Sequence, residues 1–110
     1  MADKLKSSYD LAGGDLVMAL TSQANSEQSA SLQLVLGDTF DGTTATARFK
    51  QSNSLDLLDV NWNYLPEDAM VLISGSNLLQ TNSFTCRYIA VEIIVGDATT
   101  GVSTFHQNFQ

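Results

Sequence analysis

Few residues of this 110-residue sequence have side chains that could act as nucleophiles, bases or metal ligands. The single cysteine, Cys86, and the single histidine, His106, lie in no motif that links them. A catalytic thiol needs a basic partner that activates it, and the sequence indicates none. It also contains no Gly-rich phosphate loop and no serine nucleophile elbow. We therefore predict that the protein is not an enzyme and needs no cofactor.

Three pairs of acidic residues could in principle help to bind a calcium ion through their carboxylates. The pairs are Asp38 with Asp41, Asp56 with Asp59, and Glu67 with Asp68. None of them has the dense, alternating pattern of oxygen ligands that marks a calcium loop. Aspartate is also a favoured turn residue. The sequence therefore predicts structural roles for these pairs and no metal site.

The charge balance excludes several classes of partner. Twelve acidic and five basic side chains give a net charge of -7, which opposes attraction to nucleic acid or to anionic lipid. No apolar run approaches the roughly 18 residues that span a bilayer, and the first residues lack the apolar segment of a secretory signal. Charged residues make up only 15% of the chain, so Ser, Thr, Asn and Gln must cover much of its surface. Such a surface suits contacts between subunits.

Short apolar runs separated by Gly, Asn, Asp, Ser and Thr predict strands and turns rather than helices. The ranges expected to be strands are 16–20, 31–36, 44–51, 58–64, 70–73, 86–95 and 102–109. Residues 74–77 read as a turn. Strands at this spacing indicate one antiparallel β-sandwich, of the jelly-roll type, over residues 15–110.

Alternation along these runs predicts which side chains face the core. The residues expected to contribute most to stability are Leu34, Phe49, Trp62, Ile89, Val91 and Ile93. Trp62 and Tyr64 share one parity with Leu58 and Val60, which favours the core for Trp62. For Tyr64, at the end of the run, core and surface are both open, because a phenol can reach water.

Residues 1–14 are polar, and we expect them to form a flexible N-terminal arm. In an assembly, such an arm often becomes ordered against a neighbour. Leu5 and Tyr9 would be its anchors, and a frayed terminus is the alternative. With Tyr64 and His106 they are the side chains that the sequence suggests as partner contacts.

The second half of the chain resembles a group of small virion proteins of tailed bacteriophages. The resemblance covers about residues 51–105 and rests on four segments: Gln51-Ser-Asn, Val60-Asn-Trp-Asn-Tyr-Leu65, Arg87-Tyr-Ile-Ala-Val, and Ala98-Thr-Thr-Gly-Val-Ser-Thr-Phe105. In that group, a Ser-Asn-Asp-Gly turn before an Asn-Trp pair precedes an Arg-Tyr strand and a final hairpin. Here residues 54–59 replace the tight Asp-Gly turn with a longer corner, and Phe105-His106 replaces an Ala-Tyr ending.

The resemblance implies a jelly-roll or discoidin-like sandwich that serves as a head decoration, auxiliary capsid or fibre component. We therefore expect a structural protein of the virion, made in the host cytoplasm. Its partners would be further copies of itself and other virion proteins such as a major capsid protein, with neither nucleic acid nor membrane bound. The alternative is a carbohydrate-binding β-sandwich, which would bind a glycan as a monomer.

Overall fold

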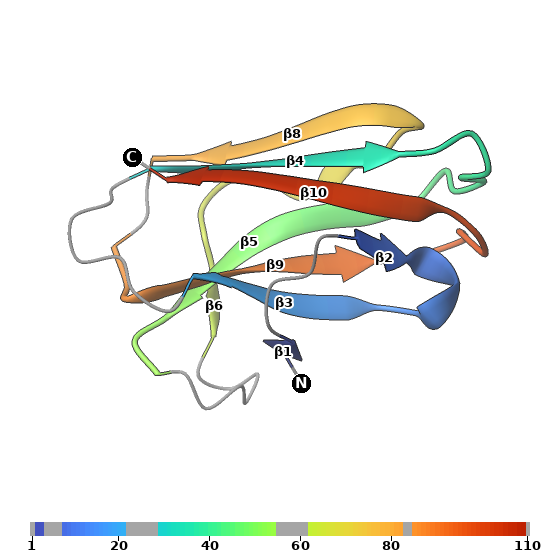
Figure 1. Cartoon of the computed structure of the whole chain (residues 1–110). Helices are drawn as coiled ribbons and strands as arrows, with labels where there is room; N and C mark the ends of the chain where they lie inside the picture. Colours follow the sequence, from blue (N-terminus) through green and yellow to red (C-terminus); the bar gives the residue numbers. More distant parts are fainter. Residues whose placement is uncertain (1, 4–7, 22–28, 55–61, 83–84, 110) are drawn as a thin grey trace.

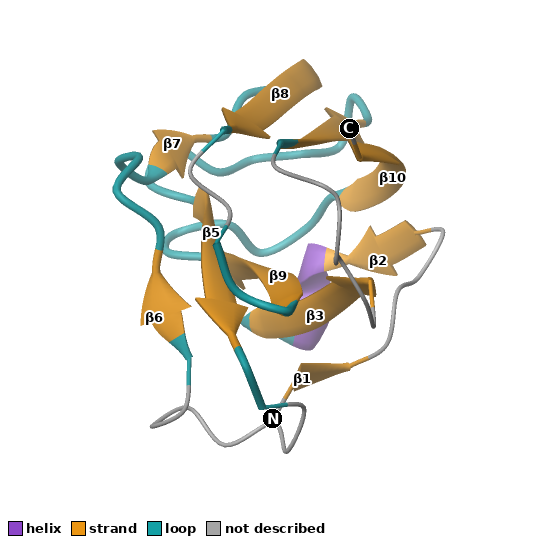
Figure 2. Cartoon of the chain, turned by 90° about the vertical axis from the view of Figure 1, so that its left-hand side faces the viewer, coloured by secondary structure: helices purple, strands orange, loops and turns teal. Residues whose placement is uncertain are grey.

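Two β-sheets packed face to face make up the protein (Figures 1 and 2). The computed structural model describes residues 2–3, 8–21, 29–54, 62–82 and 85–109. Sheet A has the order β1 (Ala2–Asp3), β3 (Leu16–Thr21), β9 (Tyr88–Ile94), β5 (Thr46–Ser52) and β6 (Asn63–Tyr64), and β7 (Met70–Val71) also pairs with β5. Sheet B has the order β2 (Ser8–Asp10), β10 (Val102–Phe109), β4 (Ala30–Leu36) and β8 (Gly75–Thr81). The expected all-β sandwich is confirmed.

The strands pair in the nested order of a jelly roll. β2 pairs antiparallel with β10, β3 with β9, β4 with β8, and β5 with both β6 and β7. The chain therefore behaves as one long antiparallel ribbon that doubles back after β5. Rolling this ribbon brings β10 beside β4 and β9 beside β5, and these two pairings complete the sheets.

The core lies between the sheets and is built from the residues that alternation predicts. In β4 the buried positions include Leu32, Leu34 and Leu36, and each is 0–2% exposed. The six residues expected to stabilise the fold, Leu34, Phe49, Trp62, Ile89, Val91 and Ile93, are all buried, with exposures of 0–6%. The predicted burial is confirmed. Five of the six belong to the core cluster, because facing strands place side chains of one parity in the space between the sheets, whereas Trp62 is buried outside that cluster, next to β6.

The N-terminal segment differs from the expected arm over residues 8–14. β2 lies beside β10 in sheet B, and Leu11 is 1% exposed. The backbone N–H of Leu11 donates to the carbonyl of Gly101 at 2.7 Å. The sequence did not predict this order, because the strand that pairs with β2 is β10, at the other end of the chain. Residues 4–7, and Leu5 with them, lie outside the described residues.

A short 3-10 helix, η1 (Leu11–Gly13), follows β2 and leads into β3. The side chain of Asp10 caps it by accepting a hydrogen bond from the N–H of Ala12 at 3.0 Å. Within the part of the chain that the structure describes, no helix has the length and apolar character needed to cross a bilayer.

The turn predicted over residues 74–77 is wrong, since β8 begins at Gly75. The sequence of β8 does not alternate between apolar and polar residues, because two of its inward positions are polar. Buried Asn77 replaces an apolar contact with hydrogen bonds: its amide nitrogen donates to the carbonyls of Leu34 and Ile73, and its oxygen accepts from the N–H of Ile73. Inward polar positions of this kind are stable only when they are paired.

Two predicted strands are shorter in the structure. The run over 58–64 contributes β6, which is Asn63–Tyr64, and positions 58–61 lie outside the described residues. The run over 70–73 contributes only Met70–Val71. Trp62 is buried and Tyr64 is 48% exposed, so the two rings do not share one environment.

Two loops at one end of the sandwich carry the same pattern, Asp-x-Thr-Thr, at residues 41–44 and 97–100. The first loop connects β4 to β5 and the second connects β9 to β10. The Asp97 carboxylate accepts hydrogen bonds from the backbone N–H groups of Thr43 and Thr44, both at 2.8 Å, and from both threonine hydroxyls. One loop is thereby held by the aspartate of the other.

The reverse contact completes the pair. The Asp41 carboxylate accepts from the N–H groups of Thr99 at 2.8 Å and Thr100 at 3.1 Å, and from the Thr99 hydroxyl. We call this reciprocal arrangement the Asp–Thr clasp. Hydrogen bonds from the side chain and backbone of Thr99 lower the pKa of Asp41. Those from the Thr43 hydroxyl and the Thr44 and Thr43 backbone lower the pKa of Asp97 far below its ordinary value of 3.8.

The clasp should make stability sensitive to acid. Because the pKa of each carboxylate is lower in the folded chain than in the unfolded one, the clasp stabilises fully above about pH 4 and progressively less as the pH falls toward the lowered values. Urea unfolding at intervals between about pH 2 and 6 should show a steeper loss for the wild type than for Asp41→Asn/Asp97→Asn. Equal slopes for the two proteins would contradict the clasp as a source of stability.

Candidate functional site

On the outer face of sheet B, the three strands β10, β4 and β8 carry no carboxylate, lysine or arginine. The register aligns nine outward residues in three rows: Thr104, Val35 and Ser76; His106, Gln33 and Leu78; Asn108, Ser31 and Gln80. We call these nine residues the neutral face. The side chain of Gln33 donates to the Ser76 hydroxyl at 2.7 Å, which ties two of its strands together. Asp10 lies outside it, opposite Val102 at the loop end of the sheet.

Charge is concentrated elsewhere on the molecule. The described basic residues, Arg48, Lys50 and Arg87, belong to sheet A or to the segment that enters it. Asp41 and Asp97 belong to the clasp at the loop end. The nine residues of the neutral face carry no charged side chain, although the chain has a net charge of -7. The central part of a protein interface is typically depleted of charged residues, so this face is the best candidate for a contact surface.

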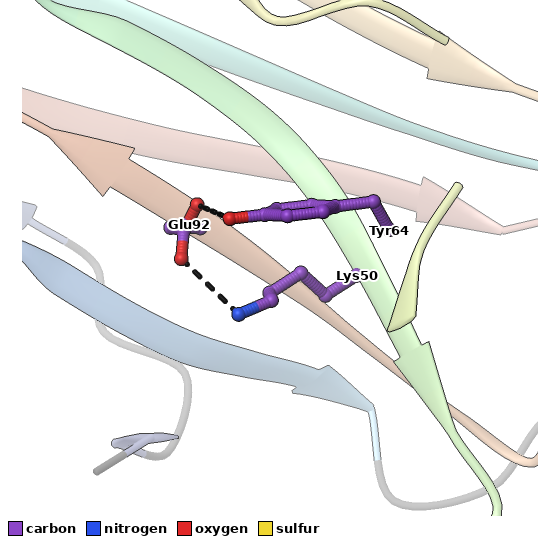
Figure 3. A network of polar contacts seen from close by, with 3 residues as sticks. All are labelled: Lys50, Tyr64 and Glu92. Atoms are coloured by element: carbon purple, nitrogen blue, oxygen red, sulfur yellow. Dashed lines mark hydrogen bonds and ion pairs between the residues drawn. The ribbon is translucent and has the colours of Figure 1, made fainter. Parts of the chain in front are cut away.

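The outer face of sheet A has the opposite character, because its polar groups bind one another (Figure 3). Glu92 accepts a hydrogen bond from the Tyr64 hydroxyl at 2.6 Å and pairs with the Lys50 ammonium at 3.2 Å. The Tyr64 ring lies 3.9 Å from the guanidinium carbon of Arg48 and 4.8 Å from the Lys50 nitrogen. Arg48 also donates to the carbonyls of Leu65 and Glu67. These groups stabilise the junction of β5, β6 and β9 and leave little capacity for a ligand.

Removing Glu92 should therefore destabilise the fold. The side chains of Lys50 and Glu92 are only 7% and 12% exposed, so Glu92→Ala leaves an ammonium without its partner in a poorly hydrated place. We expect the free energy of unfolding to fall by about 1–3 kcal/mol. Urea titration would measure it, with Glu92→Gln, which keeps one acceptor, as the milder variant. No measurable loss for Glu92→Gln would show that the charge of Glu92 contributes nothing.

The structure separates the four side chains suggested as partner contacts. His106 lies exposed in the middle row of the neutral face, and Tyr64 lies on the other side of the sandwich. Tyr9 is half-buried against the core, and its hydroxyl donates to the carbonyl of Gly14 at 2.8 Å. Leu5 is outside the described residues. Of the four, His106 alone belongs to the neutral face.

A polar cleft of about 450 Å³ opens at the end of the sandwich opposite the clasp. It is lined by Ser29, Ala30, Ser31, Glu67, Gln80, Thr81, Asn82 and Asn108. Hydroxyl and amide groups of this kind can bind sugar hydroxyls. No aromatic ring is among the described lining residues, so the cleft offers no stacking platform for a sugar. The described residues also contain no group of three or more His, Cys, Asp or Glu side chains that could hold a metal ion.

The neutral face ends at β8, whose far side is a sheet edge with no strand partner among the described residues. β8 is the terminal strand of sheet B and pairs over its whole length with β4. Leu78, in the middle of the strand, is 47% exposed. The edge was not predictable from local sequence, because residues 74–77 have the composition of a turn and a strand's place at a sheet edge depends on pairing with distant residues.

We compared the chain with known protein families, curated proteins and solved structures. No family model, curated protein or solved structure matches the chain. The function must therefore be argued from the fold, the neutral face and the open edge.

Proposed function

We propose that the chain is a non-enzymatic structural component of a tailed-phage virion, such as a head decoration, auxiliary capsid or fibre-type protein. It assembles through symmetric contacts with itself and with a capsid protein. The observation that carries the proposal is the neutral face, a charge-free sheet surface on a strongly acidic chain. The jelly-roll topology supports it, since this fold is common among viral capsid proteins. The segments that resemble small phage virion proteins support it further.

A test of the proposal is the composition of purified particles. Antibodies against the chain should label intact tailed particles from its source, and mass spectrometry should find the chain in them at a fixed ratio to the major capsid protein. Particles without the chain, together with abundant free chain in the same lysate, would contradict the proposal.

The polar cleft favours a second candidate function, the binding of a carbohydrate. Serine, threonine, asparagine and glutamine side chains line it, together with Glu67, as in sites that hydrogen-bond sugar hydroxyls. A glycan array probed with the monomeric chain, followed by calorimetry, would test this function. Binding that is lost in Asn108→Ala and retained in Val102→Ala would favour it, since Asn108 lines the cleft and Val102 does not.

A further inference from the structure

We infer that β8 is a dimerisation strand: two copies of the chain pair antiparallel along β8, about a two-fold axis that passes by Leu78. Sheet B would then continue from one copy into the other, and the two neutral faces would join into one. The inference identifies the surface through which the proposed virion subunit contacts a second copy of itself. It rests on the proposed function only for that biological role.

The open edge of β8 lacks the features that usually protect such edges. A terminal strand presents a row of backbone N–H and C=O groups that can pair with another strand. Proteins commonly block this with charged side chains, proline, bulges or very short strands. β8 is seven residues long, Gly-Ser-Asn-Leu-Leu-Gln-Thr, with no charge, no proline and an unbroken register to β4.

The other terminal strands in the described part of the chain are short, although Phe105–Phe109 of β10 also has no described partner on the side of β2. β1 and β6, the outer strands of sheet A, have two residues each, β7 also has two, and β2 in sheet B has three. Short strands of this kind offer few backbone groups to a partner. β8 is the long exception among the described edge strands.

Antiparallel self-pairing suits the residues of β8. Only a register centred on Leu78 pairs all seven positions, with Gly75 opposite Thr81 and Ser76 opposite Gln80 of the other copy. Directly opposed residues share a sheet face, so the two Leu78 side chains would lie together on the outer face. Each is 47% exposed in the single chain. The pairing therefore covers apolar surface at the centre of the strand.

The uncharged edge is the place where a second copy can approach most easily. Two molecules of net charge -7 repel each other, and they can approach most easily where neither presents a charge. β8 and the neutral face beside it meet this condition. Ile73, which is 61% exposed and whose N–H donates to Asn77 on β8, adds an apolar side chain next to the edge.

Charge placed at the edge tests the inference. Light scattering and sedimentation over a range of concentrations should give twice the chain mass for the wild type. Leu78→Lys places two ammonium groups side by side and should weaken the dimer roughly tenfold or more. The matched control is Val102→Lys, because Val102 is 48% exposed in sheet B but lies on the central strand β10. Circular dichroism melting should show that both variants stay folded.

A cross-link supplies a positive signal. In a Cys86→Ser background, Leu78→Cys should form a covalent dimer on mild oxidation, since opposed residues of an antiparallel pair lie at distances that a disulfide can bridge. Val102→Cys in the same background should not. A wild type that is monomeric at all concentrations, together with a Leu78→Cys variant that does not cross-link, would overturn the inference. A dimer that dissociates with Val102→Lys but not with Leu78→Lys would overturn it too.

These readouts use the purified chain alone. If the chain dimerises through β8 but is absent from virus particles, the proposed function is contradicted and the inference is supported. A monomer that is nevertheless a constituent of particles would do the reverse.

Discussion

Replacement of Trp62 by alanine should lower the free energy of unfolding by about 3–5 kcal/mol. Trp62 is 6% exposed, and the deleted indole would leave a cavity that the neighbouring groups can only partly fill. The loss is measured by urea unfolding, followed by far-UV circular dichroism because the variant lacks the only tryptophan. A loss below about 1 kcal/mol would show that the indole is not part of the interior.

Trp62→Phe is the matched control for this variant. The indole Nε1 is buried and has no hydrogen-bond partner among the described residues. Phenylalanine keeps most of the apolar area and removes this buried donor, so we expect it to recover more than half of the stability that alanine loses. A loss as large as that of alanine would mean that the Nε1 donor has a bonding role.

Gly96→Ala should have an effect of similar size. Gly96 has a φ of +56°, a left-handed conformation that costs a residue with a Cβ about 1–2 kcal/mol. A Cβ there would also lie 2.9 Å from the backbone C and O of Thr44, a residue of the clasp, and overpacking of this kind costs roughly 1–3 kcal/mol. We expect a total loss of about 2–5 kcal/mol, measured by thermal and urea unfolding.

Three further glycines separate the two causes. Gly14→Ala introduces only backbone strain, because φ is +92° and no atom lies within 4 Å of the added Cβ. Gly42→Ala introduces only overlap, at 2.8 Å from the Cβ of Ala98. Gly37→Ala introduces neither and should be nearly neutral. If Gly96→Ala were no more damaging than Gly37→Ala, the close approach of the two clasp loops would be in error.

Local alternation predicted inside and outside well where the inward residues are apolar. Leu32, Leu34 and Leu36 in β4, and Ile89 and Val91 in β9, face the core as expected. The same approach failed at β8, where Asn77 and Thr81 occupy inward positions. A polar residue can lie inside a sandwich when its hydrogen bonds are supplied by other strands, and the sequence of β8 alone does not contain that information.

The candidate site was accessible to sequence reasoning only in part. The low charge content suggested a surface for subunit contacts, and His106 was suggested as a contact residue. That His106, Gln33 and Leu78 form one row follows from the register of three strands that are far apart in the chain. The repeated Asp-x-Thr-Thr pattern was a usable signal for the clasp, because identical short loops with carboxylates and hydroxyls can bind each other.

The sequence by itself determined the all-β class, the single core and the inward parity of most strands, because alternation and turn residues act over a few neighbouring positions. The tertiary structure decided which strands pair, which strand is left at an edge, and where the uncharged side chains gather. It also placed Ser8–Asp10 in sheet B and Leu11 in the core rather than in a free arm. These outcomes depend on contacts between residues up to about a hundred positions apart, such as Ser8 with Thr104, and only the rolled ribbon brings such residues together.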